Sequence, residues 1–186
     1  MKITMVIPSY WGRKKSEGWR RSDSVFDHPT PLDEEGTLER ALNSVAHLKN
    51  KDFNLVVLGV STAEDIRREV ESRISTITAS SDSGIETLLF SYSHLDMVHH
   101  YLSEHKKEQF IPLLRLQGYS DVRNLCLFAA HLLGSEVAVL IDDDEIFEDP
   151  QFMEKAQEFI GKEFAGDEVL AVDDCCDDGE EHGPPH

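Results

Sequence analysis

Apolar and polar positions follow two patterns that alternate along the chain. Short continuous apolar runs rich in β-branched residues indicate buried strands, and stretches with an apolar residue every three or four positions indicate amphipathic helices. The predicted strands cover 3–7, 54–60, 86–92, 136–142 and 169–172. The predicted helices begin near 37, 62, 95, 120 and 150. Because strands alternate with helices, we predict a doubly wound α/β fold with a mostly parallel central sheet.

The run at 136–142 ends in four consecutive acids, from Asp142 to Glu145. Side chains alternate along an extended chain, so Asp142 and Asp144 are expected on one side and Asp143 on the other. Carboxylates held close together repel one another unless a cation neutralises them, and Mg²⁺ or Mn²⁺ prefers such oxygen ligands. The pattern predicts a metal site at Asp142 and Asp144. The alternative is a solvated acidic turn before the helix near Pro150.

The first strand is followed by Pro8, Ser9 and Tyr10, which are predicted to break it into a loop. A longer segment, 11–36, carries five bases and both tryptophans of a strongly acidic chain. Loops that follow strands of a parallel sheet lie at its ligand-binding edge, so these cations could contact a phosphate-bearing substrate. The alternative is a surface insertion, which the frequency of solvated basic runs favours.

Length and composition predict one domain, 1–172, followed by an acidic, disordered tail, 173–186. With 36 acids and 18 bases the formal net charge is -18, which argues against nucleic acid as a partner. The chain shows no secretory leader, no transmembrane run and an odd count of three cysteines, so we expect a cytoplasmic protein. Four histidines in 94–105 do not share a tight helical face and are expected to be solvated.

Four segments resemble, in their order and spacing, the family 2 glycosyltransferases with the GT-A fold. They are Val6-Ile-Pro-Ser-Tyr10, Leu38-Glu-Arg-Ala-Leu-Asn-Ser-Val45, Val122-Arg-Asn-Leu125, and Leu140-Ile-Asp-Asp-Asp-Glu145 with Asp149-Pro150 after it. The resemblance covers about residues 1–160. It implies a Rossmann-like α/β/α sandwich that binds a nucleoside-diphosphate sugar and transfers the sugar to an acceptor.

The resemblance also implies roles for individual residues. Asp142 and Asp144 match the Asp-x-Asp motif that holds Mn²⁺ or Mg²⁺ on the donor diphosphate, and Asp143 lies between them in the donor-binding set. Pro8, Ser9 and Tyr10 match the first-strand loop beside the nucleotide. Arg123 matches the basic position before the family's asparagine.

Two departures from the family limit what is implied. The second strand ends in Leu58-Gly59-Val60-Ser61 where the family has an acid that reads the base, so base recognition is lost or moved to the inserted loop 11–36. After the acidic strand the family adds an acceptor site and, in inverting members, a general base, and neither is found here. The chain is therefore expected to be a donor-binding half.

Three functions remain open from the sequence. The first is a metal-dependent glycosyltransferase-like domain. The second is a noncatalytic or truncated donor-binding half that acts with a partner chain or a second copy. The third is a nucleotidyltransferase, which would need a Gly-rich phosphate loop where this chain has Pro-Ser-Tyr-Trp-Gly-Arg-Lys-Lys.

Overall fold

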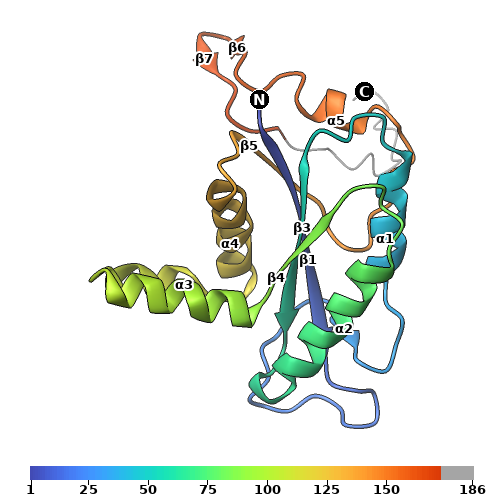
Figure 1. Ribbon diagram of the computed structural model, residues 1–186, viewed down its shortest axis with the longest axis vertical. Coiled ribbons are helices and arrows are strands. Elements are labelled where there is room, and N and C mark those ends of the chain that lie inside the picture. The colour runs from blue at the N-terminus through green and yellow to red at the C-terminus, as the bar shows by residue number, and fades with distance from the viewer. Residues whose placement is uncertain (173–186) are drawn as a thin grey trace, which may run out of the picture.

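A computed structural model describes residues 1–172, and its centre is a five-stranded sheet in which every strand pair is parallel (Figure 1). The strands are β1 (Ile3–Gly12), β2 (Thr30–Pro31), β3 (Asn54–Ser61), β4 (Thr87–Phe90) and β5 (Val137–Leu140). β1 lies next to β3, and β4 forms the edge beyond β3. The other side of β1 is shared, with β5 along its first half and β2 along its last two residues. The predicted α/β fold with a parallel sheet is confirmed.

Helices cover both faces of this sheet, as Figure 1 shows. They are α1 (Leu38–Ser44), α2 (Arg67–Ser80), α3 (Tyr92–Glu104), α4 (Tyr119–Leu132) and α5 (Phe152–Ala156), with the short 3-10 helices η1 (Val45–His47), η2 (Glu64–Ile66) and η3 (Glu108–Leu113). The first two helices pack on one face together with α5, and α4 packs on the other face. The alternation along the strands explains this arrangement, because Met5 and Ile7 join the first core while Val6 joins the second.

Strand β1 does not end at Pro8, as the sequence had suggested, but continues to Gly12. The carbonyl of Val6 accepts a hydrogen bond from the N–H of Ile141, so the backbone polar groups of Val6 point toward β5. The backbone nitrogen of Pro8, two residues on, points to the same side. β5 has ended at Leu140, and no strand replaces it until β2. The missing N–H of Pro8 therefore breaks no hydrogen bond between strands. The strand continues past it and places Ser9 and Tyr10 at the carboxyl edge of the sheet.

The segment after β5 is less regular than predicted. α5 stops at Ala156, and beyond it Phe159 is 54% exposed, so the apolar face of the predicted longer helix is buried only along its first part, at Met153. The strand predicted at 169–172 is absent from the described residues; the chain forms instead a hairpin of β6 (Glu163–Phe164) and β7 (Asp167–Glu168). No helix within 1–172 has the length and hydropathy to cross a membrane. The tail predicted to be disordered, 173–186, lies outside the described residues.

Candidate functional site

The acidic segment lies where β5 ends, at the carboxyl edge of the parallel sheet. The strand stops at Leu140, and a turn follows in which the N–H of Glu145 donates to the carbonyl of Asp142 over 3.2 Å. The side chains of Asp142 and Asp143 leave this turn in different directions, one toward α4 and the other toward the start of α1. Asp144 is exposed to solvent.

Asp142 forms an ion pair with Arg123 of α4. Nη2 of Arg123 lies 2.7 Å from Oδ1 of Asp142, and the two side chains are 39% and 50% exposed. Helix α4 packs along β1, and this packing brings its first turns beside the tip of β5. The cation and the carboxylate are therefore adjacent and both open to solvent, so a charged ligand could contact either of them.

Asp143 is built into the fold instead. Its carboxylate accepts hydrogen bonds from the hydroxyls of Ser9, at 2.5 Å, and Thr37, at 3.4 Å. The Ser9 oxygen in turn accepts the indole N–H of Trp11. Burial raises the pKa of Asp143 to about 6, Ser9 opposes this shift by stabilising the anion, and the charge of Asp144 adds to it. Asp143 therefore ties the acidic turn to β1 and to the start of α1.

Three aromatic rings lie beside the ion pair. The Tyr10 ring is 4.7 Å from Phe26 and 5.5 Å from Tyr119, measured between centroids. The Tyr10 hydroxyl is buried and has no hydrogen-bond partner among the described residues. Burial raises the pKa of Tyr10, while the positive charge of Arg123 opposes the shift. This cluster joins β1, the inserted loop and the first residue of α4.

Four of the five bases of the inserted loop are paired with acids. The guanidinium of Arg13 is almost fully buried between Asp23, at 2.9 Å, and Asp65, at 2.6 Å. Arg20 lies 3.2 Å from the same Asp65. Lys14 pairs with Glu69 at 3.6 Å, and Lys15 pairs with Glu34. The loop is thus an ion-paired surface insertion, and a phosphate would have to compete with carboxylates for these cations.

A cavity of about 440 Å³ lies at the carboxyl ends of β1 and β3, under the inserted loop. Its walls carry charges of both signs and several hydroxyl groups. They are Arg13, Arg20, Ser22, Asp23, Ser24, Ser61, Thr62, Ala63, Glu64, Asp65, Arg67, Tyr92 and Gln117. Arg67 lies over the Tyr92 ring at 4.1 Å, and the Tyr92 hydroxyl donates to the carbonyl of Leu116. The lining is polar with balanced charge, so it suits an uncharged polar group better than a bare anion.

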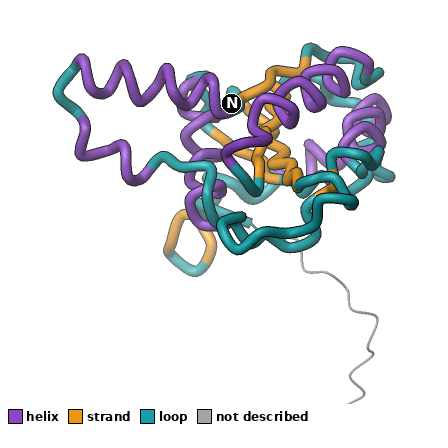
Figure 2. Tube along the Cα trace, turned by 90° about the horizontal axis from the view of Figure 1, so that it is seen from below, coloured by secondary structure: helices purple, strands orange, loops and turns teal. Residues whose placement is uncertain are grey.

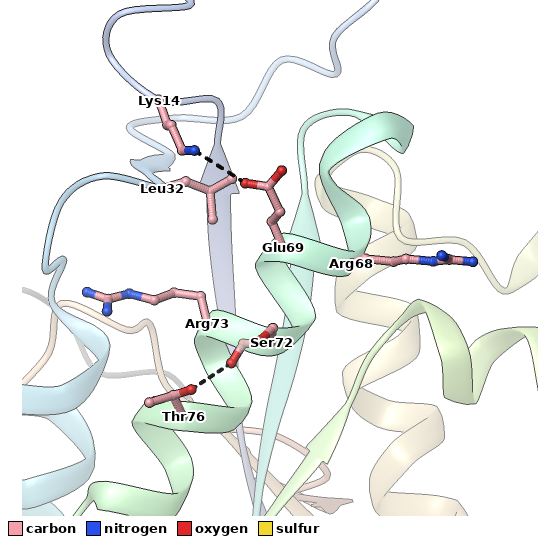
Figure 3. A pocket seen from close by; sticks show the side chains of 7 residues that line it. All are labelled: Lys14, Leu32, Arg68, Glu69, Ser72, Arg73 and Thr76. Atoms are coloured by element: carbon pink, nitrogen blue, oxygen red, sulfur yellow. Dashed lines mark hydrogen bonds and ion pairs between the residues drawn. The ribbon is translucent and has the colours of Figure 1, made fainter.

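A second cavity of about 450 Å³ lies along α2, and Figure 3 shows its lining. Three of the lining residues are basic, but their side chains do not converge. Lys14 reaches toward Glu69, whereas Arg68 and Arg73 extend to opposite sides of the helix (Figure 3). This arrangement does not form an anion site.

The four histidines of α3 and its end are not gathered at one point. Nδ1 of His94 accepts the N–H of Ser91 at the start of α3, and Nε2 of His99 lies 2.8 Å from the carbonyl of Leu114. His100 pairs with Glu104 one turn on, and His105 contacts the Tyr101 carbonyl. These contacts are local to the helix and to the segment packed on it.

Within residues 1–172, no three side chains of His, Cys, Asp or Glu converge to form a metal site. The acidic turn offers two carboxylates open to solvent, Asp142 and Asp144. That donor set fits Mg²⁺ or Mn²⁺ only if a ligand supplies further oxygens, as phosphates commonly do for these hard cations. The metal prediction at Asp142 and Asp144 therefore stays a prediction that depends on a second ligand.

Sequence reasoning missed the contact of Thr37 with Asp143, and it missed Phe26 and Tyr119, whose rings pack on Tyr10. Asp65 is a further residue that sequence reasoning did not assign to the site; it lies in η2, directly after β3, and lines the cavity. The acids within 11–36, six against five bases, were the available signal that the loop's cations would be paired internally.

The chain has no match among family models, curated proteins or solved structures. The resemblance to family 2 glycosyltransferases thus rests on the motifs alone and stays a prediction.

Proposed function

We propose that this domain binds a nucleoside-diphosphate sugar through a divalent cation at the acidic turn and transfers the sugar to an acceptor. The observation that carries the proposal is the pair of solvent-open carboxylates, Asp142 and Asp144, at the carboxyl edge of a wholly parallel sheet with Arg123 beside them. Ligands of open parallel sheets bind outside this edge. In this proposal the fold is of the GT-A type.

Asp142 and Asp144 would hold Mg²⁺ or Mn²⁺, with donor phosphates completing the ligand set. When bound, the cation would neutralise the charge that develops on the diphosphate leaving group. Arg123 would then have two anionic partners within reach, Asp142 and the diphosphate. Because its side chain is 39% exposed, it can turn toward the ligand without leaving a buried carboxylate unpaired.

Asp143 supports this site through the fold. Its bonds to Ser9 and Thr37 hold the turn against β1, so the flanking carboxylates keep their positions before a ligand arrives. Ser9 contacts Asp143 of the acidic turn, and Tyr10, the next residue, contacts Phe26 of the inserted loop. The polar cavity below that loop is the proposed place of the nucleoside, which makes the loop the source of base recognition.

The test is isothermal titration with UDP, GDP and their sugar conjugates, each with and without Mn²⁺. Wild-type protein should bind one nucleotide class only when the metal is present, and the Asp142→Ala/Asp144→Ala variant should lose that binding. The control is Asp167→Ala/Glu168→Ala, which removes the same charge from the exposed hairpin. Equal affinity in the first variant and in wild type would refute the assignment.

A second candidate function is a noncatalytic partner subunit that keeps the fold, acts with another chain and has no chemistry of its own. Two observations favour it: β4 is an open sheet edge, and α3 buries only Leu95. Both leave surface that the described residues do not cover. A well-folded sample that neither binds nucleotides nor hydrolyses nucleotide sugars under any metal condition would select this function over the first.

A further inference from the structure

One buried polar group at the carboxyl edge of the sheet has no partner within residues 1–172. It is the hydroxyl of Tyr10, which is shielded from solvent and forms no hydrogen bond there. Such a hydroxyl destabilises the fold, because its bonds to water are lost and not replaced. Unpaired buried polar groups are rare in folded proteins, and a functional role is one of the few reasons for keeping one.

Tyr10 lies on the α4 side of the sheet, beside the acidic turn. Figure 2, which views the molecule from below, shows helices on both sides of the strands. The Tyr10 ring packs in the core that α4 covers, together with Val6 of its own strand and Leu140 of the neighbouring β5. Asp142 follows Leu140 by two residues, and its side chain also turns toward α4. Tyr10 and Asp142 therefore leave neighbouring parts of the sheet edge on the same side.

Helix α4 brings Arg123 to the same place. Tyr119 and Arg123 lie four residues apart, on one face of this helix. The Tyr119 ring is 5.5 Å from the Tyr10 ring, and Nη2 of Arg123 is 2.7 Å from Oδ1 of Asp142. Burial raises the pKa of Tyr10 most, the positive charge of Arg123 lowers it, and the negative charge of Asp142 raises it. The phenol is thus within electrostatic reach of both members of the ion pair.

The ion pair can exchange its partners. Its two side chains are 39% and 50% exposed, so Arg123 can rotate into solvent or toward an anion. Asp142 then loses its partner, whereas the Tyr10 hydroxyl lacks one already. A hydrogen bond from the phenol to the carboxylate satisfies both groups, and a charged acceptor makes such a bond stronger than one between neutral groups. Asp142 is the side chain that moves, because the Tyr10 ring is held by Phe26 and Tyr119.

We propose that Tyr10 is a positioning residue for Asp142, whose carboxylate accepts the Tyr10 hydroxyl whenever Arg123 turns away. In the free protein Arg123 holds the carboxylate and the hydroxyl stays unpaired. When an anionic ligand draws Arg123 away, Tyr10 keeps the carboxylate fixed for a cation, as outer hydrogen bonds do for metal-ligating carboxylates. This ligand-bound half of the inference rests on the proposed nucleotide-sugar site, whereas the exchange between Arg123 and Tyr10 does not.

The first experiment tests the exchange without a ligand, by urea unfolding of wild type, Tyr10→Phe, Arg123→Met and the double variant. Phenylalanine keeps the ring that packs on Phe26 and Tyr119 and removes only the hydroxyl. In the wild-type background Tyr10→Phe should leave the urea midpoint unchanged or raise it, because the hydroxyl has no bond to lose. In the Arg123→Met background the same substitution should lower the folding equilibrium constant about fivefold, as the loss of one hydrogen bond does.

The matched control is Tyr119→Phe. The Tyr119 hydroxyl accepts the N–H of Asp27 over 2.6 Å, so its removal should have the same effect with and without Arg123. In an Arg123→Met/Asp142→Ala background the effect of Tyr10→Phe should disappear, because the acceptor is gone. An equal effect of Tyr10→Phe in the wild-type and Arg123→Met backgrounds, whether no loss in either or the same loss in both, would overturn the proposal.

The second experiment titrates Tyr10→Phe with UDP and GDP in the presence of Mn²⁺. Metal-dependent binding should be about tenfold weaker than in wild type, because Asp142 is no longer held once Arg123 has moved. Equal affinity of the two proteins would overturn the ligand-bound half of the inference and leave the proposed function standing. A wild-type protein that binds neither nucleotide would refute the proposed function instead, and the urea experiment would still decide the exchange.

Discussion

Two charged regions meet at the carboxyl edge of the sheet, and they use their charges differently. The inserted loop 11–36 carries five bases, and four of them are paired with carboxylates, with Arg13 buried between Asp23 and Asp65. Among residues 1–172, the acidic turn after β5 has a single cation partner, Arg123, and both members of that pair are open to solvent. Charge that is already paired and buried supports the fold, whereas charge that is open and under-compensated is available to a ligand. The number of charges in a segment does not distinguish these two cases.

The largest expected effect comes from removing the apolar anchor of the inserted loop. Phe26 is 6% exposed and packs against Tyr10 and Tyr119. Phe26→Ala should lower the free energy of unfolding by about 3–5 kcal/mol, the usual cost of truncating a buried ring. Urea unfolding followed by fluorescence measures it, and Val25→Ala, 76% exposed, is the control with an effect within about 0.5 kcal/mol. A loop that is merely a loose insertion would tolerate both changes equally.

The next largest effect on stability is expected at Asp143, whose carboxylate is less open to solvent than those of Asp142 and Asp144. Its pKa is about 6 in the folded protein against an ordinary value of 3.8, so the folded state keeps a proton that the unfolded state has lost between these values. Wild-type stability therefore falls as the pH rises through this window. The free energy of unfolding of Asp143→Asn, relative to that of wild type, should therefore increase by about 2–3 kcal/mol as the pH rises from 4 to 7. Urea unfolding at each pH measures this difference.

Ser9→Ala provides the check on the direction of this effect. The Ser9 hydroxyl stabilises the Asp143 anion and lowers its pKa. Removing the hydroxyl should raise this pKa, so the loss of stability with rising pH should extend to higher pH than in wild type. A stability difference between wild type and Asp143→Asn that does not change with pH would show that Asp143 is not a buried, titrating group.

The smallest effects compare two arginines directly. Arg13→Met should lower the urea midpoint at pH 7, because the buried Asp23 loses its cation, but by less than Phe26→Ala since Asp23 keeps the N–H of Arg20. Arg13 lowers the pKa of Asp23, so this difference is present above pH 3.8 and disappears as the pH falls through the lowered pKa. Arg123→Met should change the stability by about 1 kcal/mol or less, as expected for an exposed pair. A larger loss at Arg123 than at Arg13 would reverse the comparison between the two regions.

The sequence was sufficient for the alternation of strands and helices and for the position of the acidic segment at a strand end. Both follow from local patterns, because a buried parallel strand must be apolar throughout and a helix on its face must be amphipathic. The divergence of Asp142 and Asp143 was likewise expected from side-chain alternation, and the structure sends them to α4 and to α1. The metal and nucleotide-sugar predictions at these residues remain to be tested.

The tertiary structure decided what local patterns could not. Whether Pro8 ends a strand depends on whether a neighbour needs its missing N–H, and that neighbour, β5, is more than 100 residues away and stops short. Whether the bases of 11–36 are free depends in part on Asp65 of η2 and Glu69 of α2, which lie within ion-pair distance of the loop. Sequence by itself determined which side chains are apolar, charged or periodic; only the folded chain determined which charges found partners, because pairing is a property of distances between residues remote in the sequence.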